Sequence, residues 1–292
     1  MRIHSPSLPE LHAFVAVART GSLTAAAQHL SVTQGAVSHA IQRLEVHLGL
    51  QLFDRHRRGS ALNAAGQAYF DAVAPALDAL ETASARARGQ EDPDLLRIAV
   101  IPTFASHWLI RRLPRFRELH PKVRLDFVPY QREHLFTFPN MHATIRGGDG
   151  TFPEGVEGAY LTGRLIVPVL RPDAGCITQP ADLQHGPLLF HTNQPDAWKI
   201  WFTALGCPAS DLQLAHGFDQ VSQLLEAAAA GLGAAIVQRC LVGDYIDDGR
   251  LRIAWDAEVI NSRGYYLAYP FHRRLHPPLA AFQKWILEEV NI

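Results

Sequence analysis

The sequence predicts a multidomain α+β protein in which a small helical head is joined by one long helix to a larger body. Three observations support this fold class. Residues 22–45 have the apolar periodicity of two short helices. Residues 64–89 are rich in alanine and carry an apolar repeat with alternating spacings of three and four. Beyond residue 95, apolar runs of strand length alternate with amphipathic helical segments, which indicates α/β lobes with largely parallel sheets.

The composition bounds the possible classes of protein. A chain of 292 residues with 48% hydrophobic content is long enough for two or more domains. The formal net charge is −1, but residues 1–63 hold six arginines, no lysine and three acids, so this segment carries 6 − 3 = +3. A basic head on a near-neutral body suits a DNA-binding module attached to a larger sensor. We find no signal peptide and no apolar run of about 20 residues, and so expect a cytoplasmic protein.

The head begins with an amphipathic helix at 8–19, which ends at Thr20 and Gly21. Ser22 is positioned to cap a second helix at 24–30, and residues 31–33 form a turn. A third helix is expected at 34–44. Its apolar positions, spaced for one face, are Ala36, Val37, Ile41 and Leu44.

The other face of this third helix is polar, which is what a helix needs to enter a DNA major groove. Gln34 can pair with adenine through two hydrogen bonds, and Gly35 allows the backbone to approach closely. Ser38, His39 and Arg43 lie further along the same side. The alternative is an ordinary all-helical domain with a solvated polar face, because periodicity alone does not specify function.

Residues 50–62 follow as a wing, in which Arg55, Arg57 and Arg58 sit beside Gly59. Such arginines contact phosphate or the minor groove, and the alternative is a solvated basic loop. The long helix at 65–88 has a heptad seam that predicts helix pairing. Pro75 should kink or divide it. Residues 90–94 are polar, contain a proline and form a hinge.

The body is predicted element by element from its alternating pattern. Strands are expected at 96–101, 123–128, 143–145, 165–170, 188–190, 233–237 and 265–269. Helices are expected at 102–119, 198–205, 221–230 and 278–290. The chain crosses between two lobes near residue 161.

The run SLTAAAQHLSVTQGAVSHAIQRLEVHLGLQLFDRHRRGSALNAAG closely resembles the winged helix-turn-helix of LysR-type transcriptional regulators. The resemblance implies DNA contacts from the third helix and wing, and dimerisation through the long helix, with a homodimer or homotetramer as the assembly. It also implies a C-terminal effector domain with two lobes like a periplasmic binding protein. The matching pieces of the body lie at 101–105, 108–109, 143–146, 218–219, 227–228, 231–233, 249–251 and 265–267.

These boundaries divide the chain into a DNA-binding domain (1–63), a linker helix (64–89), a hinge (90–94) and an effector domain (95–292). Lobe I is expected at about 95–161 and 268–292, and lobe II at about 162–267. Two of the matching pieces resemble the branch of the family that contains activators of glycine cleavage and regulators of β-lactamase.

A small-molecule effector is expected between the lobes, at strand ends and helix N-termini. Thr103 begins one helix, and its hydroxyl with the free N–H groups of Phe104 and Ala105 would bind a carboxylate. Ser222 begins a helix on the opposite lobe. The alternative for Thr103 and Ser222 is ordinary N-capping. In relatives, the positions matching Thr103, Ser222 and Tyr265 face the effector cleft.

Three further residues near this cleft follow from their places in the sequence. Gln131 follows the second strand and Arg146 the third, and both are candidates for effector binding. Arg146 has the alternative of a structural pair with Asp149. His142 stands where relatives usually have an acid, and its simplest interpretation is a surface residue.

Other functions have less support. The chain has no Gly-rich phosphate loop, HExxH motif or G-x-S-x-G elbow, so we do not expect an enzyme or a cofactor. A simple solute-binding protein would not need the helical head. The 15 histidines show no metal spacing, and we expect no metal site. The three cysteines are far apart and are expected to be free thiols rather than a redox switch.

Overall fold

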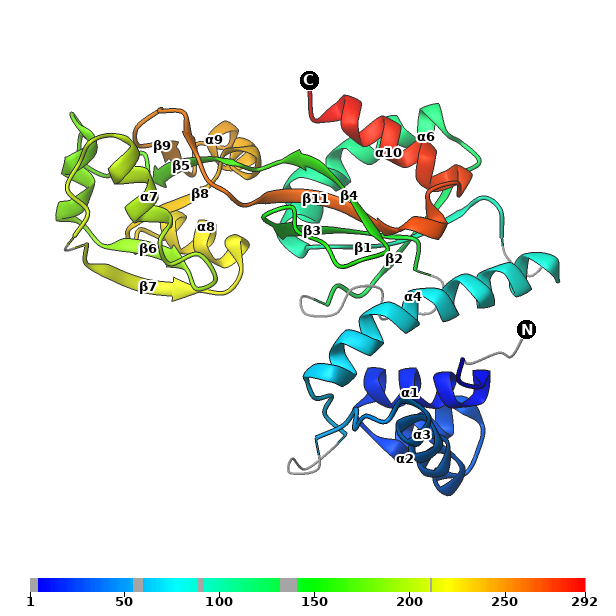
Figure 1. Cartoon of the computed structure of the whole chain (residues 1–292). Coiled ribbons are helices and arrows are strands. Elements are labelled where there is room, and N and C mark those ends of the chain that lie inside the picture. Colours follow the sequence, from blue (N-terminus) through cyan, green and yellow to red (C-terminus); the bar gives the residue numbers. More distant parts are fainter. Residues whose placement is uncertain (1–4, 55–59, 89–91, 132–140, 211, 292) are drawn as a thin grey trace.

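The computed structural model describes residues 5–54, 60–88, 92–131, 141–210 and 212–291. Figure 1 shows three parts: a helical head at the bottom, the long helix α4 (Ala64–Ala87) crossing above it, and a body built on two sheets. Both views place the long helix between the head and the body. No helix in these ranges is long and apolar enough to cross a membrane.

The head contains α1 (Leu8–Thr20), α2 (Leu23–Leu30) and α3 (Gln34–Leu48). Ser22 caps α2 as predicted, because its hydroxyl accepts from the Ala25 N–H at 3.4 Å. Ser31 ends α2 in the left-handed region, with φ of 56°. Thr33 then caps α3 through the Ala36 N–H. The third helix runs one turn beyond the predicted end.

The apolar face of α3 packs on α1 and α2 through small and branched side chains. Val37, Ala40 and Ile41 are buried there, in one cluster with Ala26 and Ala27 of α2. The small alanines let the two helices approach closely. Ala36, which was predicted to lie on this face, is exposed, so Ala40 takes its place in the apolar stripe.

The long helix is fixed to the head by packing and by polar contacts. Phe14 of α1 contacts the ring of Tyr69, with centroids 5.4 Å apart. Arg19 donates to Asp78 at 2.8 Å. The sequence predicted that Pro75 would kink or divide the long helix. Pro75 lies inside α4, which is not divided. A proline removes only one helical hydrogen bond, and the helix continues on both sides of it.

The first sheet has the order β2-β1-β3-β11-β4. Its strands are β1 (Leu95–Val100), β2 (Arg124–Val128), β3 (Ala143–Gly148), β4 (Val156–Thr162) and β11 (Gly264–Pro270). Helical segments α5 (Pro102–Phe104), η1 (Ala105–Leu109), η2 (Ile110–Arg112) and α6 (Leu113–Leu119) connect β1 to β2. η5 (Phe271–Arg273) leads to α10 (Pro277–Glu289), which packs beside α6 through Phe116 and Trp285, with ring centroids 5.0 Å apart.

The second sheet has the order β10-β5-β8-β6-β7, with β9 also paired to β5. Its strands are β5 (Leu165–Leu170), β6 (Leu188–His191), β7 (Leu214–Phe218), β8 (Ala234–Gln238), β9 (Arg252–Ile253) and β10 (Val259–Ile260). Its helices are η3 (Pro180–His185), α7 (Ala197–Ala204), α8 (Val221–Ala229), η4 (Arg239–Leu241) and α9 (Gly243–Asp247). Side chains of β5 alternate between two clusters, as a strand buried on both faces requires.

The structure corrects two predictions about these sheets. Both are mixed rather than largely parallel, because β11 runs antiparallel to β3 and β4, and β5 runs antiparallel to β8. The reason is that strands entering from the other lobe run in the opposite direction. In addition, residues 264–267, expected in lobe II, belong to β11 and therefore to the first sheet.

The lobes are joined by two short crossovers, at 163–164 and 261–263. The Asn261 N–H donates to the Arg164 carbonyl at 2.7 Å, so the crossovers are bonded to each other. Arg164 also donates to the Tyr266 hydroxyl at 2.7 Å. Gly163 has φ of 93°, a conformation that favours glycine. Backbone bonding between the crossovers restricts how the lobes move relative to each other.

Candidate functional sites

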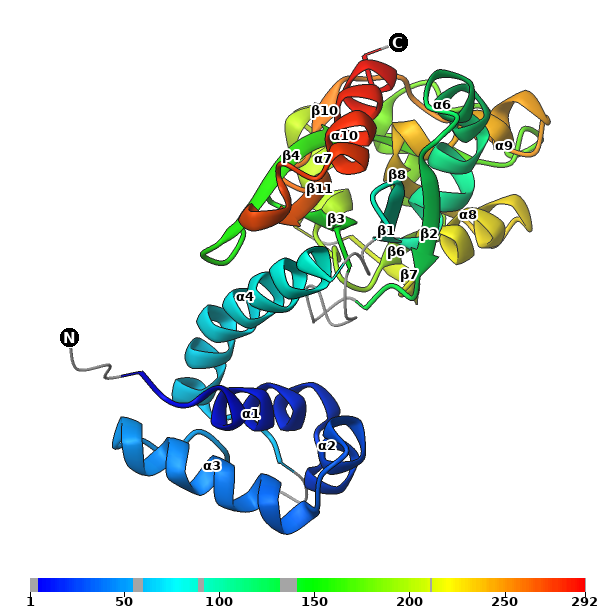
Figure 2. The same ribbon diagram turned by 90° about the vertical axis from the view of Figure 1, so that its right-hand side faces the viewer.

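The outer face of α3 is the candidate DNA-reading surface. Gln34, Gly35, Ser38 and His39 are all exposed. A Cβ on Gly35 would meet nothing within 4 Å, so the backbone is open to an approaching partner. Figures 1 and 2 both place α3 farther from the body than α1. The predicted residues thus share one accessible face, and their role in DNA binding stays a prediction.

Arg43 differs from its neighbours because it is held by a second helix. Its Nε donates to Glu10 at 2.9 Å, and the Glu10 carboxylate also accepts from the Ser7 N–H at 3.0 Å. The hydrogen bond from Arg43 is the main cause that lowers the pKa of Glu10. The Arg43 side chain remains 61% exposed. Its guanidinium is therefore tied at one edge and accessible at another.

The base of the predicted wing is visible, whereas Arg55, Arg57 and Arg58 lie outside the described residues. Phe53 and Leu62 form an antiparallel bridge. The Ser60 N–H donates to the Gly21 carbonyl at 3.2 Å, which ties the returning strand to the turn between α1 and α2.

The candidate effector site lies between the lobes, where two predicted residues meet. The Ser222 N–H donates to the Thr103 hydroxyl oxygen at 3.2 Å, across 119 positions of sequence. Thr103 is 3% exposed. Ser222 belongs to the first turn of α8 and Thr103 to α5, which continues into the π-helical turn η1. Such turns are frequent at functional sites.

A cavity of about 120 Å³ lies beside this contact. It opens at the carboxyl ends of β1 and β3 in the first lobe and of β6 and β8 in the second, where α/β folds place ligands. Its lining residues come from both lobes and from one crossover: Ile101, Tyr130, Arg146, Gly147, Gly148, His191, Asn193, Gln194, Val221, Gln238, Arg263, Gly264 and Tyr265.

Two of the predicted effector residues, Arg146 and Tyr265, line this cavity, and three others are placed differently. Phe104 is fully buried and stacks on Trp108, with ring centroids 4.9 Å apart. The sequence predicted a free N–H at Ala105. This N–H instead donates to the Ile101 carbonyl at 3.0 Å. Gln131 is exposed and does not line the cavity.

The polar residues that lobe II and the second crossover contribute to the cavity were not predicted from the sequence. Gln238 ends β8, Gln194 follows β6, and Arg263 precedes β11. The rule that polar residues at strand ends face the cleft would have found the two glutamines. No comparable signal marks Arg263, because its position depends on where the chain returns to the first lobe.

His142 is buried, which corrects the interpretation of it as a surface residue. It is 2% exposed, and its Nδ1 accepts from the Arg97 N–H at 2.8 Å. Its ring lies 4.2 Å from that of His276, and His276 in turn contacts the Leu95 carbonyl at 2.9 Å. The pair therefore joins the start of β3 to the start of α10 and to β1.

A second polar cluster also joins the lobes. Arg111 of η2 and His107 of η1 both pair with Asp244 of α9 in the other lobe, the histidine at 3.9 Å. The neighbouring Tyr245 donates to Glu226 at 2.7 Å. The two contacts with Asp244 join the lobes, whereas the hydrogen bond from Tyr245 lies within lobe II.

His107 predicts a pH dependence of stability. Burial lowers its pKa from 6.5, Asp244 opposes this, and Arg111 adds to it. The unfolded chain therefore binds a proton more readily than the folded one, so the free energy of unfolding falls as the pH drops from about 7 through the folded pKa. We expect His107→Gln to make the slope of stability against pH shallower, measured by urea denaturation.

The matched control for this prediction is His216→Gln, which removes an exposed imidazole from the edge strand β7. It measures what the loss of any histidine does to the slope. If both variants change the slope equally, the buried position of His107 is not the cause.

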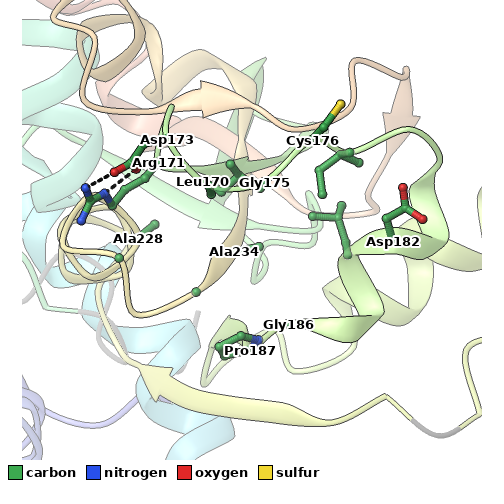
Figure 3. A pocket seen from close by; sticks show the side chains of 15 residues that line it. Leu170, Arg171, Asp173, Gly175, Cys176, Asp182, Gly186, Pro187, Ala228 and Ala234 are labelled. Carbon is green, nitrogen blue, oxygen red and sulfur yellow. Dashed lines mark hydrogen bonds and ion pairs between the residues drawn. The ribbon is translucent and has the colours of Figure 1, made fainter.

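A larger hollow of about 470 Å³ lies in lobe II alone, at the opposite end of β6 and β8. Figure 3 shows its lining, with Cys176 and Asp182 on one side and Arg171 paired to Asp173 on the other. Because Asp173 already neutralises this arginine, and no described residue of the first lobe lines the hollow, its size does not make it the effector site.

Apart from the outer face of α3 and the cavity between the lobes, few features of the described residues indicate a function. No group of three or more histidines, cysteines or acids among them is arranged to hold a metal ion. Cys176, Cys207 and Cys240 are free thiols. Burial raises the pKa of Cys240 to about 12, which suppresses the reactive thiolate.

Comparison with known proteins agrees with this architecture. The LysR substrate binding domain family matches residues 89–291, and the lysR family of bacterial regulatory helix-turn-helix proteins matches residues 8–67. The HTH-type transcriptional regulator TrpI of Pseudomonas aeruginosa is 33% identical, covering 98% of each chain. The glycine cleavage system transcriptional activator of Escherichia coli is 31% identical, covering 97% of this chain and 93% of that protein.

Solved structures match the body. The effector domain of AmpR of Pseudomonas aeruginosa has a TM-score of 0.60 at 28% identity, covering 68% of this chain and 95% of that one. An effector binding domain from Citrobacter freundii, solved with a threonine, a serine and a tyrosine substituted, has a TM-score of 0.61 at 25% identity, covering 68% and 99%. With both of its regions matched, the chain belongs to the family of LysR-type transcriptional regulators.

Proposed function

We propose that this protein binds promoter DNA as a homo-oligomer and that a small molecule bound between its lobes controls the binding. The observation that carries the DNA-binding part is the exposed polar face of α3, which projects from the head on the side away from the body. A helix of this kind reads base edges in the major groove, and the basic wing beside it adds phosphate contacts.

The effector part of the proposal rests on the contact between Thr103 and Ser222 and on the cavity next to it. The contact joins the lobes through one hydrogen bond, which a ligand with its own polar groups is able to replace. The residue types substituted in the Citrobacter freundii domain, a threonine, a serine and a tyrosine, are those of Thr103, Ser222 and Tyr265. This supports a shared location for the effector.

The first experiment measures binding of the purified protein to the DNA upstream of its own gene over a series of salt concentrations. Specific binding with a steep salt dependence supports the proposal, because contacts to phosphates release counterions. A double variant, Ser38→Ala with Arg43→Ala, is expected to weaken specific binding at least tenfold, since each lost base contact costs about 1–3 kcal/mol. Unchanged affinity would contradict the assignment of α3.

The control for this variant is Glu10→Gln, which breaks the ion pair with Arg43 but keeps the guanidinium. An exposed pair contributes about 0–1 kcal/mol to stability, so the head should stay folded in both variants. If Glu10→Gln weakens DNA binding as much as the double variant, the pair acts by positioning α3 on α1 rather than through contacts from Arg43.

A further inference from the structure

One face of the helical segment formed by α5, η1 and η2 makes polar contacts with lobe II. Thr103, His107 and Arg111 recur at intervals of four residues, which places them on the same side of this segment. Thr103 contacts Ser222 of α8, whereas His107 and Arg111 both pair with Asp244 of α9. A single segment of lobe I therefore meets two different helices of lobe II.

The Asp244 carboxylate uses both of its oxygens for these contacts. Its Oδ1 pairs with the guanidinium of Arg111, and its Oδ2 lies 3.9 Å from Nδ1 of His107. The side chains of Asp244 and His107 are each 18% exposed, whereas that of Arg111 is 58% exposed. The pair with Arg111 is thus partly screened by water, while the carboxylate that accepts both contacts is largely buried.

The two helices of lobe II that take part are bonded to each other. Tyr245, next to Asp244 in α9, is buried, and its hydroxyl donates to Glu226 of α8 at 2.7 Å. Glu226 lies one turn after Ser222 on the same helix, so the two share a face. The contacts therefore form a closed ring, which includes the helical segment of lobe I, α9 and α8, and closes at the bond between Ser222 and Thr103.

The bond that closes the ring protects an amide that its own helix leaves unpaired. The Ser222 N–H lies in the first turn of α8, where backbone donors have no partner within the helix. It donates instead to the hydroxyl oxygen of Thr103, which is a buried residue. Exchange of the Ser222 amide hydrogen with solvent therefore reports whether the contact with Thr103 is made.

Apolar packing also joins the lobes beside this bond. Phe104 and Val221, the neighbours of Thr103 and Ser222, belong to one buried cluster. Apolar contact is non-directional, so it brings the lobes together without fixing the distance between one donor and one acceptor. A hydrogen bond, in contrast, weakens steeply when its geometry changes. The polar ring therefore supplies the directional constraint that the apolar cluster lacks.

We propose that Asp244 is a positioning residue for the effector site, because it holds the helical segment of lobe I where Thr103 stays bonded to Ser222. Asp244 is not among the residues that line the cavity, so it acts through the segment and not by contact with the effector. Without its charge, the bond between Thr103 and Ser222 is made for a smaller fraction of the time. This inference rests on the proposed function, because it takes that bond as part of the effector site.

The test measures hydrogen exchange of the full-length protein by mass spectrometry, with fragmentation that resolves the Ser222 amide. Asp244→Asn removes the charge but keeps the shape of the side chain. We expect about two- to fivefold faster exchange at Ser222, the range that an exposed ion pair supplies. Asp244→Glu keeps the charge and should exchange at a rate close to that of the wild type. Salt at about 1 M should narrow the difference between Asp244→Asn and the wild type, because it screens the charges.

Two further variants make the test specific. Asp173→Asn is the matched control, because Asp173 pairs with Arg171 inside lobe II, so exchange at Ser222 should stay unchanged. Arg111→Gln breaks the same ion pair as Asp244→Asn from the exposed side chain in lobe I, and it should also speed exchange. Circular dichroism checks that each variant is folded.

Three results would overturn the inference. The first is exchange at the wild-type rate in folded Asp244→Asn or folded Arg111→Gln. The second is an equal acceleration in Asp173→Asn, which would mean that any lost ion pair loosens the protein. The third is exchange in Asp244→Glu as fast as in Asp244→Asn, which would mean that the carboxylate charge is not the cause.

A parallel arm measures binding of the same preparations to the upstream DNA, since the exchange measurement itself needs neither DNA nor effector. Specific DNA binding by the wild type, with unchanged exchange in Asp244→Asn, overturns this inference and leaves the DNA-binding part of the proposed function in place. Faster exchange in Asp244→Asn of a protein with no affinity for any DNA at low salt supports the positioning role and overturns the DNA-binding part alone.

Discussion

Gly66→Ala is expected to destabilise the head and so, on the proposed function, to weaken DNA binding strongly. A Cβ at Gly66 would lie 2.0 Å from the Leu52 carbonyl oxygen and 3.0 Å from a methyl carbon of Leu62. Backbone cannot rotate away as a side chain can, so the first turn of α4 must separate from the segment that leads into the wing. The expected loss of stability is about 2–3 kcal/mol.

This loss is large for the head because a network of hydrogen bonds depends on the same contact. The Gly66 N–H donates to the Asn63 side-chain oxygen at 2.8 Å, and Asn63 Nδ2 donates to the Gln51 carbonyl at 2.7 Å. The Asn63 N–H donates to the Leu52 carbonyl at 3.0 Å. A domain of about 60 residues is only marginally stable, so losing the network unfolds a substantial fraction of it.

Gly35→Ala is the matched control, since Gly35 is also helical but would place its Cβ in open space. Alanine in a helix is favoured over glycine by about 0.5–1 kcal/mol, so this variant should melt at or above the wild-type temperature. On the proposed function its DNA affinity should still fall, because the new methyl group would face the groove. Equal melting temperatures for both alanine variants would contradict the packing described for Gly66.

Gly163→Ala is expected to cost about 2–5 kcal/mol and to alter the cavity between the lobes. At φ of 93°, any L side chain is strained by about 1–2 kcal/mol. In addition, the Cβ would lie 2.6 Å from Cδ2 of Tyr265, adding an overpacking cost of about 1–3 kcal/mol. Tyr265 is buried and lines the cavity, so its displacement should weaken binding of any ligand there.

Gly155→Ala separates the two causes, because Gly155 has φ of 80° but a Cβ added there would meet nothing within 4 Å. The free energy of unfolding of Gly155→Ala should fall by the cost of the backbone conformation alone, about 1–2 kcal/mol. Urea denaturation of both variants measures the difference. If Gly155→Ala is as unstable as Gly163→Ala, the contact with Tyr265 carries no cost, and the crossover is less tightly packed than described.

The family and the helical head could be predicted from the sequence because their signals are local. The cap at Ser22 and the glycine after α1 mark helix ends within a few residues, and both are confirmed. The extra turn of α3 was not predicted, since Leu48 and Gly49 look equally like the start of a loop. The α+β fold class is confirmed in the same way, from alternation of strands and helices.

The details of the sheets could not be predicted because they depend on contacts distant in sequence. β7 has four exposed residues out of five and lies at a sheet edge, so it carries no apolar run. β4 reads VEGAYLT, where glycine interrupts the alternation. The antiparallel direction of β11 follows from the return between lobes, which no short pattern encodes.

The candidate site was also predictable only in part, because contacts distant in sequence place some of its residues. Arg146 was predicted to follow the third strand, but it lies inside β3, directly after three buried residues and two residues before the strand ends, and it still lines the cavity. Gln131 lies one residue too far along the chain, and Tyr130 lines the cavity instead. Arg263 depends on the second crossover, and its contribution to the cavity emerges only when both lobes are assembled.

The head is attached rigidly to α4, so a rotation at one end of this helix is amplified at the other end. Arg19 and Asp78 bond the first helix to the long helix, and Phe14 packs against it, so head and helix turn as one body. With 24 residues at about 1.5 Å each, the arm is about 36 Å long. A tilt of about 10° at its far end displaces the other end by about 6 Å, close to two base-pair steps of about 3.4 Å. On the proposed function, a small rotation of the body would therefore shift the head along the DNA.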